Sequence, residues 1–327
     1  MKKILSFLVL GVLLLTNTAI GFADTNYTVK QGDMLWKIAE QYDMKWEDLA
    51  KSNSMKNPNL IYPGQVIQVK GEMEMANKDK VVALLKSIET GDMGPVAYVN
   101  PEKYIQHNLM VGDGLEGFGE ALSHLPEGSA RVNTVRAFED GDYVFTHTDY
   151  DFFGPKIGFD VFRFEDGLIV EHWDNLTTTA SEPNPSGRTE IDGPTEVQDL
   201  DKTAENKELV KNFVNDILIN DKMEKLAQYF DGDSYIQHNA HVADGLSGLG
   251  AAIEEMTKQG MTMRYDKVHN ILGQGNFVLV MSEGEFAGKD ASYYDLFRVE
   301  NGKIAEHWDV VEEILAEDAR MNDNGKF

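Results

Sequence analysis

The side chains best suited to chemistry occur twice in this chain, in the same order and at nearly the same spacing. A histidine stands in Tyr-Ile-Gln-His-Asn at 104–108 and again at 235–239. A second histidine, followed two residues later by aspartate, stands in Glu-His-Trp-Asp at 171–174 and again at 306–309. The copies are 131 and 135 residues apart, which indicates a duplicated domain. Histidine and aspartate are common proton donors and acceptors in enzymes.

A third acid completes each set, Asp160 in Asp-Val-Phe-Arg and Asp295 in Asp-Leu-Phe-Arg. Carboxylates and histidines in one apolar cavity have pKa values pushed apart, so one group can abstract a proton beside a carbonyl while another donates to the enolate oxygen. The alternative is a structural hydrogen-bond cluster. The candidate catalytic residues are His107, Asp160, His172, Asp174, His238, Asp295, His307 and Asp309.

Strands near the end of each repeat must position these groups. Alternate side chains of a strand share a face, so His307 and Asp309 point one way and Trp308 the other. Asn301-Gly302 predicts the preceding hairpin turn. A three-residue loop with a glycine bulge would set Asp295 opposite His307 and on its face, whereas a two-residue loop would turn Asp295 away. In the first repeat, His172 and Asp174 share a face by the same alternation, and Trp173 lies on the other face.

Four further residues are expected to line the pockets: Tyr104, His147, Tyr235 and His241. The two copies differ here, because His147 has Met281 as its counterpart and His241 has Met110. The pockets therefore take different ligands, or one of them has decayed. No metal or other cofactor is expected, because no tight ligand motif is present, although histidines of the second repeat could in principle converge on a metal ion.

Each repeat opens with an amphipathic helix and ends in strands, which is typical of an α+β fold. The repeats are expected at 78–176 and 207–320, with a linker containing prolines at 177–206. A smaller unit at 26–70 has the order strand, helix, helix, strand. A short charged linker, 71–77, follows it.

The N-terminus has the pattern of a secretory signal peptide. Lys2 and Lys3 precede an apolar run at 4–15, and a small-x-small cleavage site ends at Ala23. The predicted signal is therefore 1–23. An uncleaved membrane anchor is the alternative, but the apolar run is short for a bilayer span. No stable membrane insertion is expected after cleavage.

Composition excludes several classes of site. The chain has 327 residues and no cysteine, which excludes disulfides, thiolate metal sites and a cysteine nucleophile. Its formal net charge of −25 argues against nucleic acid and anionic lipid as partners. The acidic surface fits a solubility or salt-tolerance trait.

The smaller unit reads Tyr-Thr-Val-Lys-Gln-Gly-Asp at 27–33, Leu-Trp-Lys-Ile-Ala at 35–39 and Pro-Gly-Gln at 63–65. In these residues it resembles a LysM domain, although Met34 replaces the usual threonine. The resemblance implies binding of N-acetylglucosamine glycans such as peptidoglycan. Most of Trp36 is expected in the core. The implied glycan-binding residues are Gly32, Asp33, Met34, Leu35, Asn57, Pro58, Asn59, Leu60 and Ile61.

Both long repeats also carry Asp-Gly-Leu-x-Gly, at 113–117 and 244–248. With the doubled motifs above, the repeats resemble SnoaL-like polyketide cyclase domains of the NTF2-like superfamily. The resemblance implies a cone, a curved sheet wrapped on helices around an apolar pocket. Ketosteroid isomerases of this superfamily have a pocket aspartate in a motif similar to Asp160–Arg163, which favours Asp160 and Asp295 pointing inward.

These features predict a secreted, cell-wall-associated protein. Its LysM unit would bind peptidoglycan, and its cones would bind a small apolar ligand and pair within one chain or between chains. The alternative is a cofactor-free isomerase, cyclase or dehydratase that uses histidine and aspartate. A purely structural or adhesive role is a third hypothesis.

Overall fold

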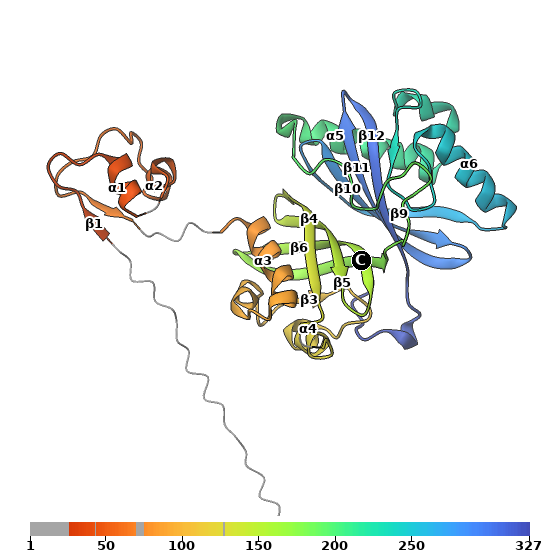
Figure 1. Cartoon of the computed structure of the whole chain (residues 1–327), viewed down its shortest axis with the longest axis horizontal. Coiled ribbons are helices and arrows are strands. Elements are labelled where there is room, and N and C mark those ends of the chain that lie inside the picture. The colour runs from red at the N-terminus through yellow and green to blue at the C-terminus, as the bar shows by residue number, and fades with distance from the viewer. Residues whose placement is uncertain (1–25, 43, 70–74, 127) are drawn as a thin grey trace, which may run out of the picture. The chain divides into compact units, whose positions relative to one another are not determined.

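The computed structural model describes residues 26–42, 44–69, 75–126 and 128–327. Two compact units divide between Met75 and Ala76 (Figure 1). The predicted signal peptide and most of the predicted 71–77 linker lie outside the described residues. Within the described ranges, no helix combines the length and the apolar character needed to cross a membrane.

The smaller unit is a two-stranded antiparallel sheet with two helices. Its elements are β1 (Asn26–Thr28), α1 (Leu35–Gln41), α2 (Trp46–Ser52) and β2 (Val66–Gln68). Leu35 and Ile38 lie three residues apart on one face of α1 and are buried against Leu49 and Ile67. Trp36 is off this stripe and 50 % exposed, so the prediction that it belongs to the core is wrong.

The larger unit contains two five-stranded sheets of identical topology, ordered β3-β7-β6-β5-β4 and β8-β12-β11-β10-β9. The first strand of each is a two-residue parallel edge strand, and the others are antiparallel. The strands are β3 (Ile105–Gln106), β4 (Arg131–Asp140), β5 (Tyr143–Asp151), β6 (Pro155–Glu165), β7 (Leu168–Thr178), β8 (Ile236–Gln237), β9 (Met263–Gln274), β10 (Phe277–Phe286), β11 (Lys289–Glu300) and β12 (Lys303–Glu313).

Helices cover the inner face of each sheet. The α-helices are α3 (Asn77–Thr90), α4 (Gly114–Ser123), α5 (Thr203–Phe213) and α6 (Gly245–Lys258). Shorter turns are the 3-10 segments Gly94–Tyr98, Leu200–Lys202, Met223–Gln228 and Glu317–Ala319 and the π-helical segment Val214–Ile219. Leu84 of α3 is buried with Phe162, and Phe213 of α5 is buried with Phe297. The predicted α+β fold with two curved-sheet domains is confirmed.

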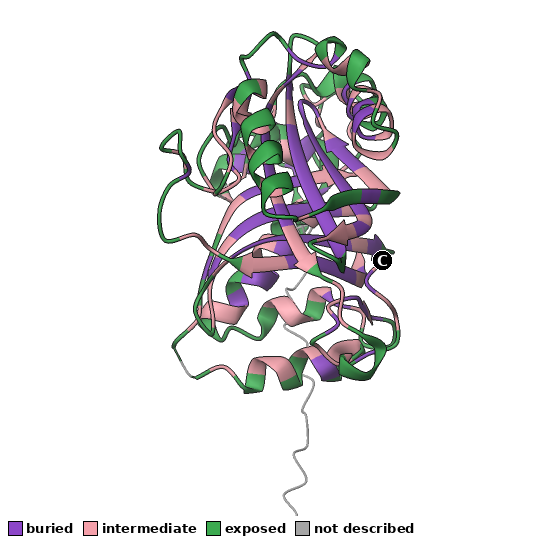
Figure 2. Cartoon of the chain, turned by 90° about the vertical axis from the view of Figure 1, so that its right-hand side faces the viewer, coloured by how far each residue is buried: buried purple, intermediate pink, exposed green. Residues whose placement is uncertain are grey.

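The outer faces of the two sheets pack against each other. One buried cluster joins Phe145 and Trp173 of the first sheet to Phe277 and Trp308 of the second. Asn175 of β7 crosses the junction, where its amide donates to the carbonyl oxygens of Ser292, at 2.8 Å, and Val310, at 3.0 Å. Figure 2 shows the buried strands gathered at the centre of this unit, with exposed residues on the surrounding helices and loops.

The predicted 177–206 linker is an ordered part of the fold rather than a loose tether. Strand β7 continues to Thr178, and α5 already begins at Thr203. Asn184 is buried, and its amide donates to Gln237 O at 2.8 Å and Val242 O at 2.9 Å. The segment thus runs from the first cone onto the second.

The C-terminal tail makes the reciprocal crossing. The Asn322 amide donates to Asn108 O at 2.8 Å and Val111 O at 2.9 Å, which belong to the first cone. The two crossing segments share a sequence pattern, Asn-Pro-Ser-Gly-Arg at 184–188 and Asn-Asp-Asn-Gly-Lys at 322–326. Their glycines adopt positive φ angles of 80° and 79°. Each repeat therefore ends in a tail that closes over the other repeat.

Candidate functional site

The second cone brings Asp295, His307 and Asp309 together on the inner face of its sheet. His307 Nε2 lies 3.0 Å from Asp295 Oδ1. The Asn239 amide donates to both Asp309 oxygens, at 3.0 and 2.9 Å. Tyr265 donates from its hydroxyl to Asp295 at 3.2 Å. Every oxygen of the two carboxylates therefore has a donor.

The hairpin that positions Asp295 has a different turn from the predicted one. Glu300 pairs with Lys303 across a two-residue loop, and a bulge follows between Arg298 and Val299. The bulge shifts the register by one residue and restores the shared face. Asp295 consequently pairs with Asp309, so the prediction that it lies opposite His307 is wrong, although it does share that face.

Electrostatics in the second cone favour protons on the cluster. Burial opposes charge on His307, but the hydrogen bond to Asp295 and the charges of Asp309 and Asp295 outweigh it and raise the His307 pKa. Burial raises the pKa of Asp309, with His307 opposing and Asp295 adding to the effect. The site is thus suited to holding a protonated imidazole beside a carboxylate.

The first cone gathers Asp160, His172 and Asp174 on its inner face, with different contacts. Tyr150 donates from its hydroxyl to Asp160 Oδ2 at 2.7 Å. His172 Nε2 lies 3.4 Å from Asp160 Oδ1, a longer separation than in the second cone. The Asn108 amide donates only to Asp174 Oδ2, at 2.7 Å. The same residue types therefore form a looser cluster here.

His107 and His238 lie on the opposite face of the sheets and do not join these clusters. His107 stacks on Trp173, with ring centroids 4.8 Å apart, and its Nε2 lies 3.1 Å from Glu171. Its Nδ1 lies 2.9 Å from Gly325 O. His238 stacks on Trp308 in the same way. Both nitrogens of each ring face acceptor oxygens, so these histidines hold the crossing tails rather than the inner clusters.

Two predicted pocket histidines also lie elsewhere. His147 is buried between the sheets, where its Nδ1 accepts a hydrogen bond from Arg136 Nη1 at 3.1 Å. Burial, followed by the charges of Arg136 and His238, holds its pKa well below the usual range. His241 is exposed on the loop after β8. Its Met110 counterpart is also exposed.

Tyr104 and Tyr235 are buried beside the clusters, in agreement with a role as wall. Burial, and then the charges of the neighbouring aspartates, raise both tyrosine pKa values. Gln237 Nε2 donates to the Tyr235 hydroxyl at 3.4 Å. Neither phenol is poised to give up a proton near neutral pH.

Each cone has a tyrosine whose hydroxyl reaches the aspartate, and neither was predicted from the sequence. The two tyrosines lie on different strands, at the two positions of an equivalent cross-strand pair. In the first cone Tyr150 pairs with Val132 across β5 and β4. In the second cone Gly284 pairs with Tyr265 across β10 and β9. The large residue has changed strands, but its hydroxyl still reaches the aspartate. Aligning the copies residue by residue conceals such an exchange.

The smaller unit carries a hollow of about 370 Å³ between its two predicted loops. Seven of its lining residues belong to the loops and α1, and Trp46 opens α2 at 40 % exposure. The lining residues are Asp33, Met34, Leu35, Trp36, Trp46, Pro58, Asn59 and Ile61. Exposed indole rings at the edge of a hollow are suited to stacking on sugar faces. Neither Trp36 nor Trp46 was predicted to bind. Trp36 can be found in the sequence as an apolar residue off the stripe of α1, whereas Trp46 is three residues before the buried Leu49 and has no such signal.

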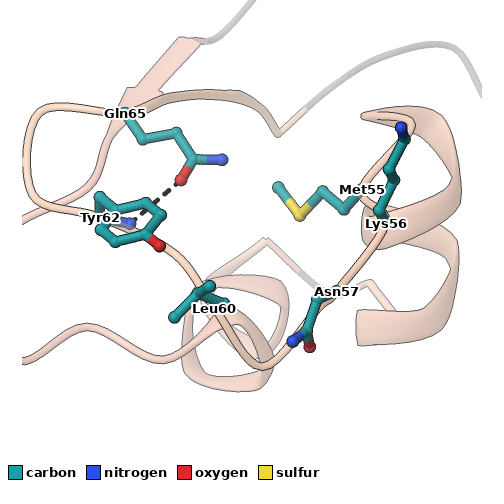
Figure 3. Close-up of a pocket in the computed structure, with 6 residues that line it drawn as sticks. All are labelled: Met55, Lys56, Asn57, Leu60, Tyr62 and Gln65. Carbon is teal, nitrogen blue, oxygen red and sulfur yellow. Dashed lines mark hydrogen bonds between the residues drawn. The ribbon is translucent and has the colours of Figure 1, made fainter.

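Three predicted glycan-binding residues, Gly32, Asn57 and Leu60, do not line this hollow. Asn57 and Leu60 line a second, shallow hollow with Met55, Lys56, Tyr62 and Gln65 (Figure 3). Gly32 forms the turn before α1 with a φ of 92°. Asp33 accepts the backbone N–H of Lys30 at 2.7 Å and the Tyr27 hydroxyl at 2.8 Å, so its carboxylate fixes the loop.

Comparison with known protein families matches two segments of the chain. Residues 27–70 match the LysM domain, and residues 210–307 match the SnoaL-like domain. The first match covers the smaller unit and the second covers most of the second cone. Both agree with the resemblances drawn from the sequence.

Individual relatives match the LysM segment. A probable autolysin of Staphylococcus aureus is 45 % identical over 49 residues, 15 % of this chain and 18 % of its own length. A probable peptidoglycan endopeptidase of Bacillus subtilis, LytE, is 47 % identical over 45 residues, 14 % of this chain and 13 % of its own. The first relatives match over a fifth of their length or less.

Among solved structures, TsrD from Streptomyces laurentii is 21 % identical with a TM-score of 0.28, covering 32 % of this chain and 91 % of its own. An NTF2-like protein from Cytophaga hutchinsonii is 13 % identical with a TM-score of 0.29, covering 33 % and 95 %. Each spans about one cone.

Proposed function

We propose that the smaller unit binds N-acetylglucosamine glycans of peptidoglycan and holds the two-cone unit at the cell wall. The observation that carries this proposal is the hollow edged by exposed Trp36 and Trp46. Support comes from the LysM match and from relatives named as an autolysin and a peptidoglycan endopeptidase. Secretion through the N-terminal signal belongs to the same proposal.

Sedimentation with purified peptidoglycan tests the wall role. The full chain should co-sediment, and the double variant Trp36→Ala, Trp46→Ala should stay in the supernatant. Val66→Ala is the matched control, because Val66 is 58 % exposed on β2 and does not line the hollow. Equal sedimentation of all three proteins would refute the proposal.

The first cone is proposed to be a diverged copy of the matched SnoaL-like domain. Its strand order is the same, and both doubled motifs occupy equivalent strands. The crossing tails extend this equivalence beyond the predicted repeat boundaries. The proposal includes pairing of the two copies within one chain, which the buried cluster between their outer sheet faces supports.

For the second cone, we propose acid–base chemistry on a small apolar molecule with a proton beside a carbonyl. Asp295 would accept that proton, and protonated His307 would donate to the enolate oxygen. The pair is buried, with its nearest atoms 3.0 Å apart. No cofactor enters this chemistry.

Deuterium exchange into a panel of small apolar ketones tests the chemistry. The full chain should catalyse exchange, and Asp295→Asn should lose at least about 100-fold of that rate. Asp160→Asn, the counterpart in the first cone, should keep it. Equal rates for wild type and Asp295→Asn would contradict the assignment.

A further inference from the structure

The first cone holds three potential ligand atoms that face one another. One nitrogen or oxygen from each of Asp160, His172 and Asp174 lies within 4.8 Å of the others, and all three residues are buried. Their other polar atoms are already engaged. Asp160 Oδ2 accepts the Tyr150 hydroxyl at 2.7 Å, and Asp174 Oδ2 accepts the Asn108 amide at 2.7 Å.

The histidine of this cluster turns its Nε2 toward the aspartates. Gln106 Oε1 accepts the backbone N–H of Asn108 at 2.8 Å, which identifies that atom as the oxygen. His172 Nδ1 lies 2.9 Å from the same oxygen, so Nδ1 carries the hydrogen. In the neutral ring, Nε2 is then a bare acceptor 3.4 Å from Asp160 Oδ1. A metal cation between these two atoms would bind the Nε2 lone pair of that neutral ring and the Asp160 oxygen.

The third ligand atom is an unsatisfied buried oxygen. Asp174 is 4 % exposed, and its Oδ1 accepts no hydrogen bond within the described part of the chain. A buried carboxylate oxygen without a donor is unfavourable. The nearest ammonium, Lys326 Nζ, is 3.8 Å away and donates instead to Glu312 at 2.6 Å. This ammonium therefore lies near the Asp174 oxygen without donating a hydrogen bond to it.

The second cone lacks these features despite carrying the same residue types. Both oxygens of Asp309 accept the Asn239 amide, at 3.0 and 2.9 Å. His307 Nδ1 lies near both ends of the Gln237 amide, 3.1 Å from Nε2 and 3.2 Å from Oε1. His307 Nε2 lies 3.0 Å from Asp295 Oδ1, closer than the 3.4 Å of the equivalent pair in the first cone. The two cones have therefore diverged in the hydrogen bonds of their carboxylates.

We infer that the first cone binds one divalent transition-metal cation through Asp160 Oδ1, His172 Nε2 and Asp174 Oδ1. Two carboxylates and one imidazole suit ions of intermediate softness, such as Mn²⁺, Fe²⁺ or Zn²⁺. Gln106 orients the imidazole through Nδ1, as outer ligands of metal-binding histidines do. Binding draws the Asp174 oxygen away from the Lys326 ammonium.

Titration of the full chain with Zn²⁺, followed by calorimetry and by NMR of ¹⁵N-labelled histidine, tests this inference. One equivalent should bind, and the resonance of His172 Nε2, assigned by its loss in His172→Gln, should move to a metal-bound position. Asp174→Asn should abolish this binding. Asp309→Asn, the matched change in the second cone, should retain it. Asn108→Ala keeps all three ligands but removes the orienting amide, and should weaken affinity about 10–100-fold.

Three results would overturn the inference. These are the absence of a stoichiometric site in the wild-type chain, a His172 Nε2 resonance that ignores the metal, and equal affinity of the wild-type and Asp174→Asn proteins. The second result does not depend on Asp174→Asn, so it remains decisive if that variant fails to fold. Weak binding that is the same in every variant identifies an adventitious ion on the acidic surface.

Discussion

At the scale of single residues, the two cones show how one set of side chains can make different hydrogen bonds. The aspartates and histidine are the same, but their hydrogen-bond partners differ. In the first cone the Gln106 oxygen faces His172, whereas in the second the Gln237 nitrogen also reaches His307. The neighbours of a group, not its residue type, decide which proton it keeps.

His307 should make the second cone more stable in mild acid than in mild base. Its pKa is raised in the folded state, so its stabilising contribution is complete below about 6.5, the unfolded value, and is lost as pH rises through the folded value. The difference in unfolding free energy between wild type and His307→Gln should therefore fall as pH increases. Urea unfolding at a series of pH values measures it, and a difference that grows with pH would contradict the assignment.

His147 provides a control of opposite sign. Its pKa is lowered in the folded state, so the unfolded chain binds the proton more readily, and stability is lost as pH falls below about 6.5. His147→Met copies Met281 of the second repeat and removes the titrating group. Relative to this variant, the wild type should lose stability on acidification. A flat difference would contradict the assignment, because it would mean that His147 has the same pKa in the folded and unfolded chains.

At the scale of elements, strand parity predicted the shared face of His172 and Asp174 and the opposite position of Trp173. That inference needs only the period of an extended strand. The face of His107 could not be predicted in this way, because its strand, β3, is only two residues long and parallel to β7. Gln106 points inward there, so His107 points outward.

The crossing segments were missed for a different reason. Proline, glycine and polar residues between two helical patterns are typical of a linker. Asn184 and Asn322 are buried, and each donates hydrogen bonds to carbonyl oxygens of the repeat to which it does not belong. No local pattern reports such a partner. The signal that could have found it is the repeated Asn-x-x-Gly-Arg/Lys, 138 residues apart.

Gly193 should be a position where the crossing segment tolerates no side chain. Its φ is 93°, and a Cβ there would lie 2.5 Å from Glu306 Oε1 and 2.8 Å from the Trp308 ring. Gly193→Ala should cost about 1–3 kcal/mol from overpacking in addition to the strain of a positive φ. Gly187→Ala is the control, because its φ of 80° is similar and nothing lies within 4 Å. Chemical denaturation measures the loss of unfolding free energy in each variant. Equal losses would show that the Glu306 and Trp308 side chains move aside at little cost.

At the scale of the whole molecule, the larger unit behaves as a fused pair of cones, each completed by the other. The first repeat's tail donates to the Gln237 and Val242 carbonyls of the second, and the second repeat's tail donates to Asn108 and Val111 of the first. The Asn108 side chain in turn contacts Asp174. Each inner cluster therefore depends on a segment of the opposite repeat.

Removing one tail asparagine should loosen the repeat to which it does not belong. Asn322→Ala leaves the Asn108 and Val111 carbonyls without their donor, which costs about 1–3 kcal/mol for buried groups. Hydrogen exchange should then accelerate at residues 105–113, and for Asn184→Ala at residues 236–244. Asn220→Ala is the control, since its amide binds only the nearby Asn215 carbonyl. Faster exchange confined to the repeat that carries the substitution would mean that each cone is stable alone. Faster exchange in the opposite repeat would establish that the two repeats form one cooperative unit.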